Sequence, residues 1–144
     1  MARRDDIVRA ARGWIGTPYQ HQASLIGIGT DCLGLVRGVW RQLFGDEPER
    51  LTAYGPGWAE SGGQEALADA ARRHLIEIEP ADFRDGDVLL FRWRPHLPAK
   101  HAGIAVSTGR MIHAQEHVAV TEIAIGNWWR RHLSHAFRFP GVDD

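Results

Sequence analysis

Apolar residues recur at helical spacing in the first half of the chain, and each such stretch has a matching start or stop signal. Asp5 and Asp6 stand in the acidic first turn that helices favour. Asp31 is a suitable N-cap and Gly45 a suitable residue just past a helix end. Helices are therefore predicted over 5–15, 32–44 and 64–74, with a loop over 19–31.

After residue 74 the apolar period changes to two, which is typical of strands. A helical turn over 127–133 is expected to pack Trp128 and Trp129 inward. Helices first and strands afterwards favour the α+β class, an antiparallel sheet with helices packed on one face, in a single domain over 1–144. The predicted strands cover 75–79, 87–93, 101–106, 110–115, 118–123 and 134–139.

Two features of the helical half predict close packing and a functional loop. Gly34 and Gly38 lie four apart on the second predicted helix, where the missing side chains let another backbone or a sheet approach closely. Residues 45–63 form a long irregular stretch rich in Gly and Pro. A loop of this length in a compact domain is expected to contact a partner or to serve function.

Composition narrows the classes of protein that remain. The 144 residues are 44% hydrophobic and 24% charged, with a net charge of −1. This balance gives no field that would attract nucleic acid, so no nucleic-acid partner is expected. No signal peptide and no segment long enough to cross a bilayer is visible, so we expect synthesis in the cytoplasm without membrane insertion.

Cys32 is the one cysteine, so an internal disulfide is excluded. At the start of the predicted helix over 32–44, its thiolate would be stabilised by the helix dipole and by free backbone N–H groups. The same amides could stabilise an oxyanion. A buried structural cysteine is the alternative, and from position alone it is the favoured one.

Two histidines lie on neighbouring predicted strands, and the turn between them decides whether they meet. A two-residue turn at 108–109 would put His113 on the face opposite to His101, whereas a three-residue loop ending at Gly109 puts both on one face. Gly109 suits the left-handed position of the longer loop, so we favour it. Gly103 and Ala105 on the histidine face would leave room for a helix to dock.

This shared face suggests a thiol mechanism in which His101 is the base for Cys32 and His113 orients His101. Two unrelated strand histidines remain the alternative, and a zinc site formed by these three residues is a remote one. Tyr19 could donate to a substrate carbonyl or to an oxyanion, or be an ordinary loop aromatic. Asp31 has a sound role as N-cap, and could bind a substrate ammonium group.

Five motifs in order resemble the NlpC/P60 family of cell-wall cysteine peptidases, and together they span residues 17–114. A narrower stretch, Gly34 to Trp40, resembles the phage-type branch encoded in prophage and gene-transfer-agent tail clusters. The motifs are Thr17-Pro18-Tyr19, Asp31-Cys32-Leu33-Gly34-Leu35, Asp85-Gly86-Asp87-Val88-Leu89-Leu90-Phe91, His101-Ala102-Gly103-Ile104-Ala105 and Met111-Ile112-His113-Ala114.

The resemblance implies a papain-like α+β fold without a cofactor or a catalytic metal, and hydrolysis of peptidoglycan stem peptides, typically between D-γ-glutamyl and a diamino acid. By matching motif, Cys32 would be the nucleophile, His101 the base and His113 the orienting residue, with Tyr19 near the oxyanion site. Tail or baseplate proteins of a phage-like particle would be partners, and the enzyme would act in the periplasm or wall of a target cell.

One departure from the family pattern is Leu33, which stands where Ser or Thr usually follows the cysteine. This change leaves the three proposed catalytic residues intact but is expected to reshape the substrate groove. Two other readings stay open at this point. One is a structural tail protein that keeps the fold with little or no turnover, and the other is an amidase or acyl transferase that uses the same Cys–His pair.

Overall fold

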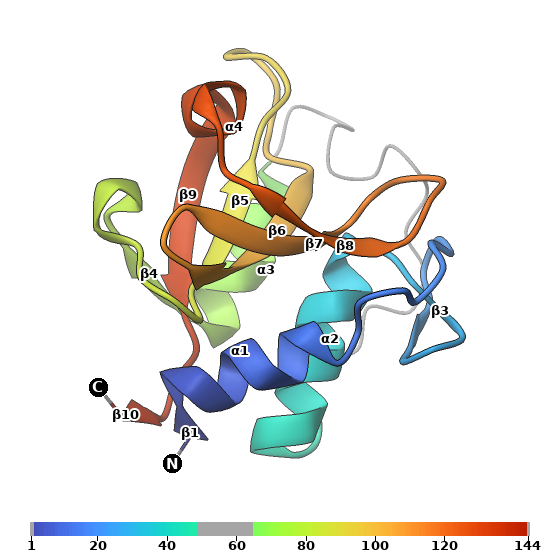
Figure 1. Cartoon of the computed structure of the whole chain (residues 1–144). Coiled ribbons are helices and arrows are strands. Elements are labelled where there is room, and N and C mark those ends of the chain that lie inside the picture. Colours follow the sequence, from blue (N-terminus) through green and yellow to red (C-terminus); the bar gives the residue numbers. More distant parts are fainter. Residues whose placement is uncertain (1, 49–64, 144) are drawn as a thin grey trace.

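The computed structural model describes residues 2–48 and 65–143, which form four α-helices, a single 3-10 turn and three sheets. The predicted strands and helices are all present, with bounds that differ by up to three residues (Figure 1). The helices are α1 (Arg4–Arg12), α2 (Cys32–Phe44), α3 (Ala66–His74) and α4 (Asn127–His132), with the 3-10 turn η2 over Pro80–Asp82.

The main sheet has six strands in the order β4-β9-β5-β6-β7-β8, and every neighbouring pair is antiparallel. Two small sheets pair β1 (Ala2–Arg3) with β10 (Val142–Asp143) and β2 (Ser24–Leu25) with β3 (Gly29–Thr30). The first of these brings the two ends of the chain side by side (Figure 1). The main strands are β4 (Ile76–Ile78), β5 (Val88–Phe91), β6 (His101–Ser107), β7 (Arg110–Ala114), β8 (Val120–Ala124) and β9 (Leu133–Arg138).

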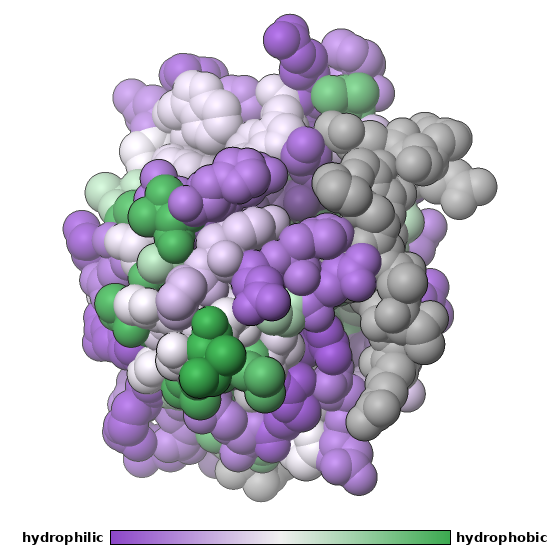
Figure 2. Space-filling view, turned by 90° about the vertical axis from the view of Figure 1, so that its right-hand side faces the viewer, coloured by the Kyte–Doolittle hydropathy of each residue, from purple (hydrophilic) through white to green (hydrophobic). Residues whose placement is uncertain are grey.

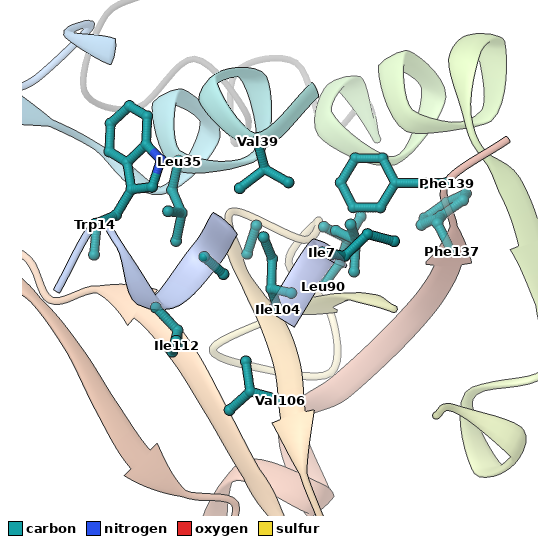
Figure 3. Packing of buried hydrophobic residues seen from close by; sticks show 14 of the residues in the cluster. Ile7, Trp14, Leu35, Val39, Leu90, Ile104, Val106, Ile112, Phe137 and Phe139 are labelled. Carbon is teal, nitrogen blue, oxygen red and sulfur yellow. The ribbon is translucent and has the colours of Figure 1, made fainter. Parts of the chain in front are cut away.

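Helices α1, α2 and α3 pack on one face of this sheet, as the α+β prediction required. The main core lies between them, where Trp14, Leu35 and Val39 face Ile104 and Ile112 of the sheet (Figure 3). Burial of such side chains contributes roughly 1.5–3 kcal/mol each. A smaller apolar cluster, which includes Leu89, Phe91, Ala105 and Met111, covers the opposite face.

The ends of α2 confirm the predicted capping. Asp31 Oδ1 accepts a 2.7 Å hydrogen bond from the backbone N–H of Gly34, and Gly45 follows the last turn with a φ of +91°. A side chain is strained at this φ, so glycine ends the helix at low cost. The cap holds Cys32 as the first residue of α2.

The prediction for the first helix was too long at its C-terminal end. The α-helix ends at Arg12 and residues 13–16 form turns, because Gly13 begins a turn that closes on Arg9 and Ala10. Trp14 is buried in the core, whereas Ile15 is 47% exposed.

Both glycines of α2 allow close approach; Gly34 meets a backbone, as predicted, whereas Gly38 meets a side chain. A Cβ at Gly34 would lie 2.0 Å from the backbone oxygen of Ala23, and a Cβ at Gly38 would lie 2.0 Å from the indole of Trp14. Gly34 therefore seats the loop before α2 against the first turn of that helix, and Gly38 seats the turn after α1 against its middle.

The β6–β7 hairpin combines the two registers considered from sequence. Ser107 pairs with Arg110 around a two-residue turn, but an irregularity between Ala105 and Ser107 shifts the pairing so that Ala105 faces Met111. Continuing this register places His113 opposite Gly103, as the glycine-terminated loop predicted. Gly109 has the expected left-handed conformation, with a φ of +72°.

The expectation that a helix docks on the face of Gly103 and Ala105 is met by α4 alone, whose Trp129 packs against the cluster that includes Ala105. Helices α1, α2 and α3 pack instead against the branched residues of the other face, Ile104 and Val106 among them, because these offer more apolar area to bury. Of the predicted loop over 45–63, residues 49–63 lie outside the described residues. None of the described helices is long and apolar enough to cross a membrane.

Candidate functional site

Cys32 and His101 line one pocket, at the point where the N-terminus of α2 reaches the start of β6. Each arrives by its own element: the Asp31 cap begins α2 at the cysteine, and β6 begins at the histidine. The sheet register then brings His113 up beside His101 from β7. The three residues expected to act together are therefore brought to one place.

The electrostatics around Cys32 favour a neutral thiol. Its Sγ lies 3.9 Å from the backbone oxygen of Lys100. Burial raises the pKa of the Cys32 thiol to about 12, and the adjacent Asp31 carboxylate adds to this rise. Backbone hydrogen bonds of Ala102 in β6, and of Leu33 and Cys32 at the helix start, lower the pKa but are outweighed. The thiolate that the helix position predicted is not the resting state.

The two imidazoles form a buried hydrogen-bonded pair. His101 Nε2 and His113 Nδ1 are 2.8 Å apart, with the rings nearly perpendicular at 89°. The side chains are 8% and 4% exposed. Burial lowers the pKa of His101 to about 3, with a further contribution from His113, and burial lowers the pKa of His113 to about 4. Both rings are therefore neutral at pH 7.

This hydrogen bond engages Nε2 of His101. In the tautomer in which Nε2–H donates to His113 Nδ1, the Nδ1 of His101 has the lone pair that can receive the proton of the Cys32 thiol. A neutral thiol beside a neutral imidazole can pass its proton when a substrate carbonyl is attacked.

Tyr19 lines the same pocket, on the loop that precedes α2. Its backbone N–H donates to the carbonyl of Val118, which ties this loop to the β7–β8 connection. Burial, Cys32 and Asp31 raise the pKa of the Tyr19 phenol to about 12. The hydroxyl therefore stays protonated and can donate a hydrogen bond at the pocket.

Asp31 borders the pocket, but both of its oxygens are already engaged. Oδ1 accepts from the N–H of Gly34, and Oδ2 accepts a 2.7 Å bond from the N–H of Gln22. The His21 ring nitrogen lies 3.8 Å from Oδ2. These contacts give Asp31 the capping role that the sequence suggested, and they also tie the preceding loop to the helix.

Sequence reasoning missed several residues of the pocket wall. Trp93 is the one that the sequence could have indicated, because Leu89, Phe91 and Trp93 alternate along one predicted strand. In the structure, Phe91 of this strand pairs with His101. Leu33, which was expected to shape the groove, is in the wall as well. The others come from segments that no local pattern links to the cysteine; they are His21, Leu67, Lys100, Ala114 and Glu116.

The prediction for the two tryptophans of α4 is half right. Trp129 packs against the smaller apolar cluster and touches both imidazoles, with centroid distances of 5.8 Å to His101 and 5.3 Å to His113. Trp128 is 46% exposed and stacks on His132. A six-residue helix can bury one of two adjacent side chains, because neighbours point about 100° apart.

Two other surfaces lie near the pocket. A more apolar cavity between α2 and α3 is bordered by Leu33, Trp40 and Leu67, and it contains neither Cys32 nor the histidine pair. The β2–β3 hairpin, which faces the viewer in Figure 2, exposes Leu25 and Ile28 on a largely hydrophilic side of the molecule.

Within the described ranges, no group of three metal-ligating side chains is gathered.

Comparisons with known proteins agree with this geometry. The model of the NlpC/P60 family matches residues 16–138. The chain is 30% identical over 137 residues to gamma-DL-glutamyl hydrolase of Bacillus subtilis, covering 94% of this chain and 29% of that protein. It is 28% identical over 127 residues to murein DD-endopeptidase MepH of Escherichia coli, covering 86% of this chain and 41% of that protein. The chain thus spans less than half the length of either relative.

Solved structures show the same fold. The NlpC/p60 domain of the peptidoglycan hydrolase SagA superposes with a TM-score of 0.64 at 25% identity, covering 96% of this chain and all of that domain. RipD from Mycobacterium tuberculosis, described as a non-catalytic NlpC/p60 domain protein adapted to peptidoglycan binding, has a TM-score of 0.52 at 16% identity, over 96% of this chain and 98% of that one. The family match covers the pocket, the histidine pair and most of the sheet, and the chain belongs to the NlpC/P60 family.

Proposed function

We propose that this chain is a cysteine peptidase that hydrolyses peptidoglycan stem peptides, with Cys32 as nucleophile, His101 as base and His113 as the residue that orients His101. The observation that carries the proposal is the 2.8 Å bond between His101 Nε2 and His113 Nδ1 beside a pocket that Cys32 also lines. It commits one nitrogen of His101 to His113 and leaves the other for the thiol.

The reaction would proceed through a thioester. The Cys32 thiol passes its proton to His101 Nδ1 as Sγ attacks the scissile carbonyl carbon. The tetrahedral intermediate collapses as the C–N bond breaks, and His101 returns the proton to the leaving amine. Water then attacks the thioester with His101 as its base, which releases the carboxylic acid and restores the thiol. Tyr19 and the first backbone amides of α2 would donate to the oxyanion.

The substrate class follows from the relatives. Their printed names include a gamma-DL-glutamyl hydrolase, a murein endopeptidase and a peptidoglycan hydrolase. We propose a bond in the stem peptide, between D-γ-glutamyl and a diamino acid, as the scissile bond. Leu33 lines the pocket next to Cys32, so its apolar side chain contributes to the shape of the substrate groove.

We further propose that the enzyme is carried by a phage-like or gene-transfer-agent tail and opens the wall during delivery. Its support is the resemblance of residues 34–40 to the phage-type branch. In a producing culture, the chain should co-sediment with particles and be labelled at the tail tip by specific antibodies. Recovery in the particle-free fraction alone would reject the delivery role and leave the peptidase proposal intact.

A non-catalytic role is the second candidate, and a specific observation favours it. The high pKa of the Cys32 thiol describes an unactivated cysteine, and RipD shows that this fold exists without catalysis. In that case the chain would bind peptidoglycan, or serve as a structural tail protein, with no turnover. An amidase or acyl transferase would turn over but leave a different product.

Digestion of purified peptidoglycan separates these functions. Wild type should release fragments that carry a new free D-glutamyl carboxyl group and a new diamino-acid amine, identified by mass spectrometry. Cys32→Ala should release none, whereas His117→Ala, at an exposed residue whose ring lies 6.0 Å from that of Tyr19, should retain activity. Binding to the sacculus without release by wild type would establish the non-catalytic role.

A further inference from the structure

Two indole rings enclose the histidine pair. Trp93, which follows β5, stacks on His101 with a centroid distance of 5.4 Å and an interplanar angle of 28°. Trp129 of α4 lies 5.8 Å from His101 and meets His113 edge-on at 78°. The two indoles also contact each other, with centroids 6.1 Å apart. These distances are in the range where aromatic pairs attract.

The two tryptophans differ in their other contacts. Trp129 contacts Phe91 at 4.9 Å and belongs to the packing of the smaller apolar cluster, so its removal would disturb the core as well as the site. Trp93 lines the pocket together with Cys32 and His101. Of the two indoles, Trp93 is thus the one that both stacks on His101 and lines the pocket.

A hydrogen bond through Nε2 fixes one point of the His101 ring but leaves its plane free to tilt. A flat ring stacked on one side restricts that tilt. We propose that Trp93 is a positioning residue, which holds the plane of His101 so that Nδ1 faces the pocket that Cys32 lines while Nε2 stays bonded to His113. This inference rests on the proposed function for its catalytic meaning, but the geometry stands without it.

The same ring covers one face of the His101 imidazole, which is 8% exposed. An imidazolium loses its hydration in such a site, so the neutral form is favoured while the indole is present. Removing the indole would admit water and let both rings take up a proton at higher pH. The titratable and charged groups around the pair, which stay in place in the variants below, are Cys32, Asp31, Tyr19, His21, Lys100 and Glu116.

The test measures protonation and catalysis in the same variants. In Trp93→Ala, the NMR titration midpoints of His101 and His113 should rise by at least one pH unit, and kcat should fall at least tenfold with KM changed less than threefold. Trp93→Phe should restore more than half of both effects. Trp128→Ala is the matched control, because Trp128 touches Trp93 and Trp129 but neither imidazole.

The outcomes separate this inference from the proposed function. If Trp93→Ala does not fold, Trp93→Leu keeps apolar volume without a flat ring and should still shift the midpoints by at least half a unit. A folded Ala or Leu variant with wild-type midpoints would overturn the positioning role. If wild type cleaves no peptidoglycan while the shift is observed, the proposed function fails and the positioning role stands.

Discussion

Asp87 shows how much of this fold depends on one buried carboxylate. Its side chain is fully buried and accepts from the backbone N–H of Arg84 at 2.8 Å and from Arg4 Nη1 at 2.9 Å. Arg138 of β9 lies 3.3 Å away. One residue thus joins the start of α1, the start of β5 and the end of β9, and a buried charge that loses its partners is costly.

Asp87→Ala is expected to lower the free energy of unfolding by about 3–5 kcal/mol, because it leaves Arg4 and Arg138 without their shared carboxylate. Urea denaturation followed by circular dichroism measures this. Asp69→Ala is the control, since Asp69 forms an exposed pair with Arg72 and should cost less than about 1 kcal/mol. Equal losses in the two variants would contradict the role given to Asp87.

At the scale of elements, the packing of the turn that follows α1 against α2 depends on the absence of a side chain at Gly38. Trp14 lies against this glycine, is 2% exposed, and donates its indole N–H to Gln42 Oε1 at 3.0 Å. A ring held by packing and by a hydrogen bond has little room to move, so an added methyl group would force the turn and the helix apart.

Gly38→Ala is therefore expected to destabilise the protein by roughly 1–3 kcal/mol, although alanine favours helix formation. The urea midpoint reports the loss. Gly126→Ala is the matched control, because a Cβ at Gly126 meets no heavy atom within 4 Å. A Gly38→Ala variant as stable as wild type would show that the close approach of Trp14 is not needed.

Elements were also the level at which sequence reasoning worked best. Local signals sufficed for α2, whose cap and stop residues adjoin the helix. They also predicted the face shared by His101 and His113, although the register shift that produces it lies between Ala105 and Ser107 and not in the turn at Gly109.

Other features could not be predicted locally. The face on which most helices pack depends on a comparison of the two faces of the sheet. Which of Trp128 and Trp129 is less exposed depends on the residues that pack near them. The pocket wall joins distant segments, so Lys100 and Glu116 carried no readable signal.

At the scale of the whole molecule, the buried histidines set a pH dependence. Burial lowers the pKa values of His101, His113 and His135 in the folded chain, so the unfolded chain binds more protons as the pH falls below about 6.5. Stability contributed by these groups is complete above pH 6.5 and is lost as the pH falls through the folded pKa values, about 4 for His113 and about 3 for His101. Carboxylates whose pKa values are lowered in the folded chain, such as Glu47 and Glu122, also lose stability at low pH. Their loss begins only when the pH falls below the pKa that these groups have in the unfolded chain.

We therefore expect the urea midpoint to decrease as the pH is lowered from 7 to 5, a range in which the carboxylates do not yet titrate. The His101→Gln, His113→Gln double variant should lose most of this dependence, and His135 should account for the remainder. A wild-type midpoint that stays constant from pH 7 to pH 5 would contradict the burial of neutral imidazoles at the site.

The most direct measurement of the central claim is the covalent state of Cys32 during turnover. Wild type should be mixed with stem peptide, quenched in acid within the first turnover, and mapped by mass spectrometry. We predict an acyl group on Cys32 that disappears as product forms, and at least a hundredfold slower acylation in His101→Ala. Release of product with no adduct on Cys32, or an unchanged rate in His101→Ala, would contradict the mechanism.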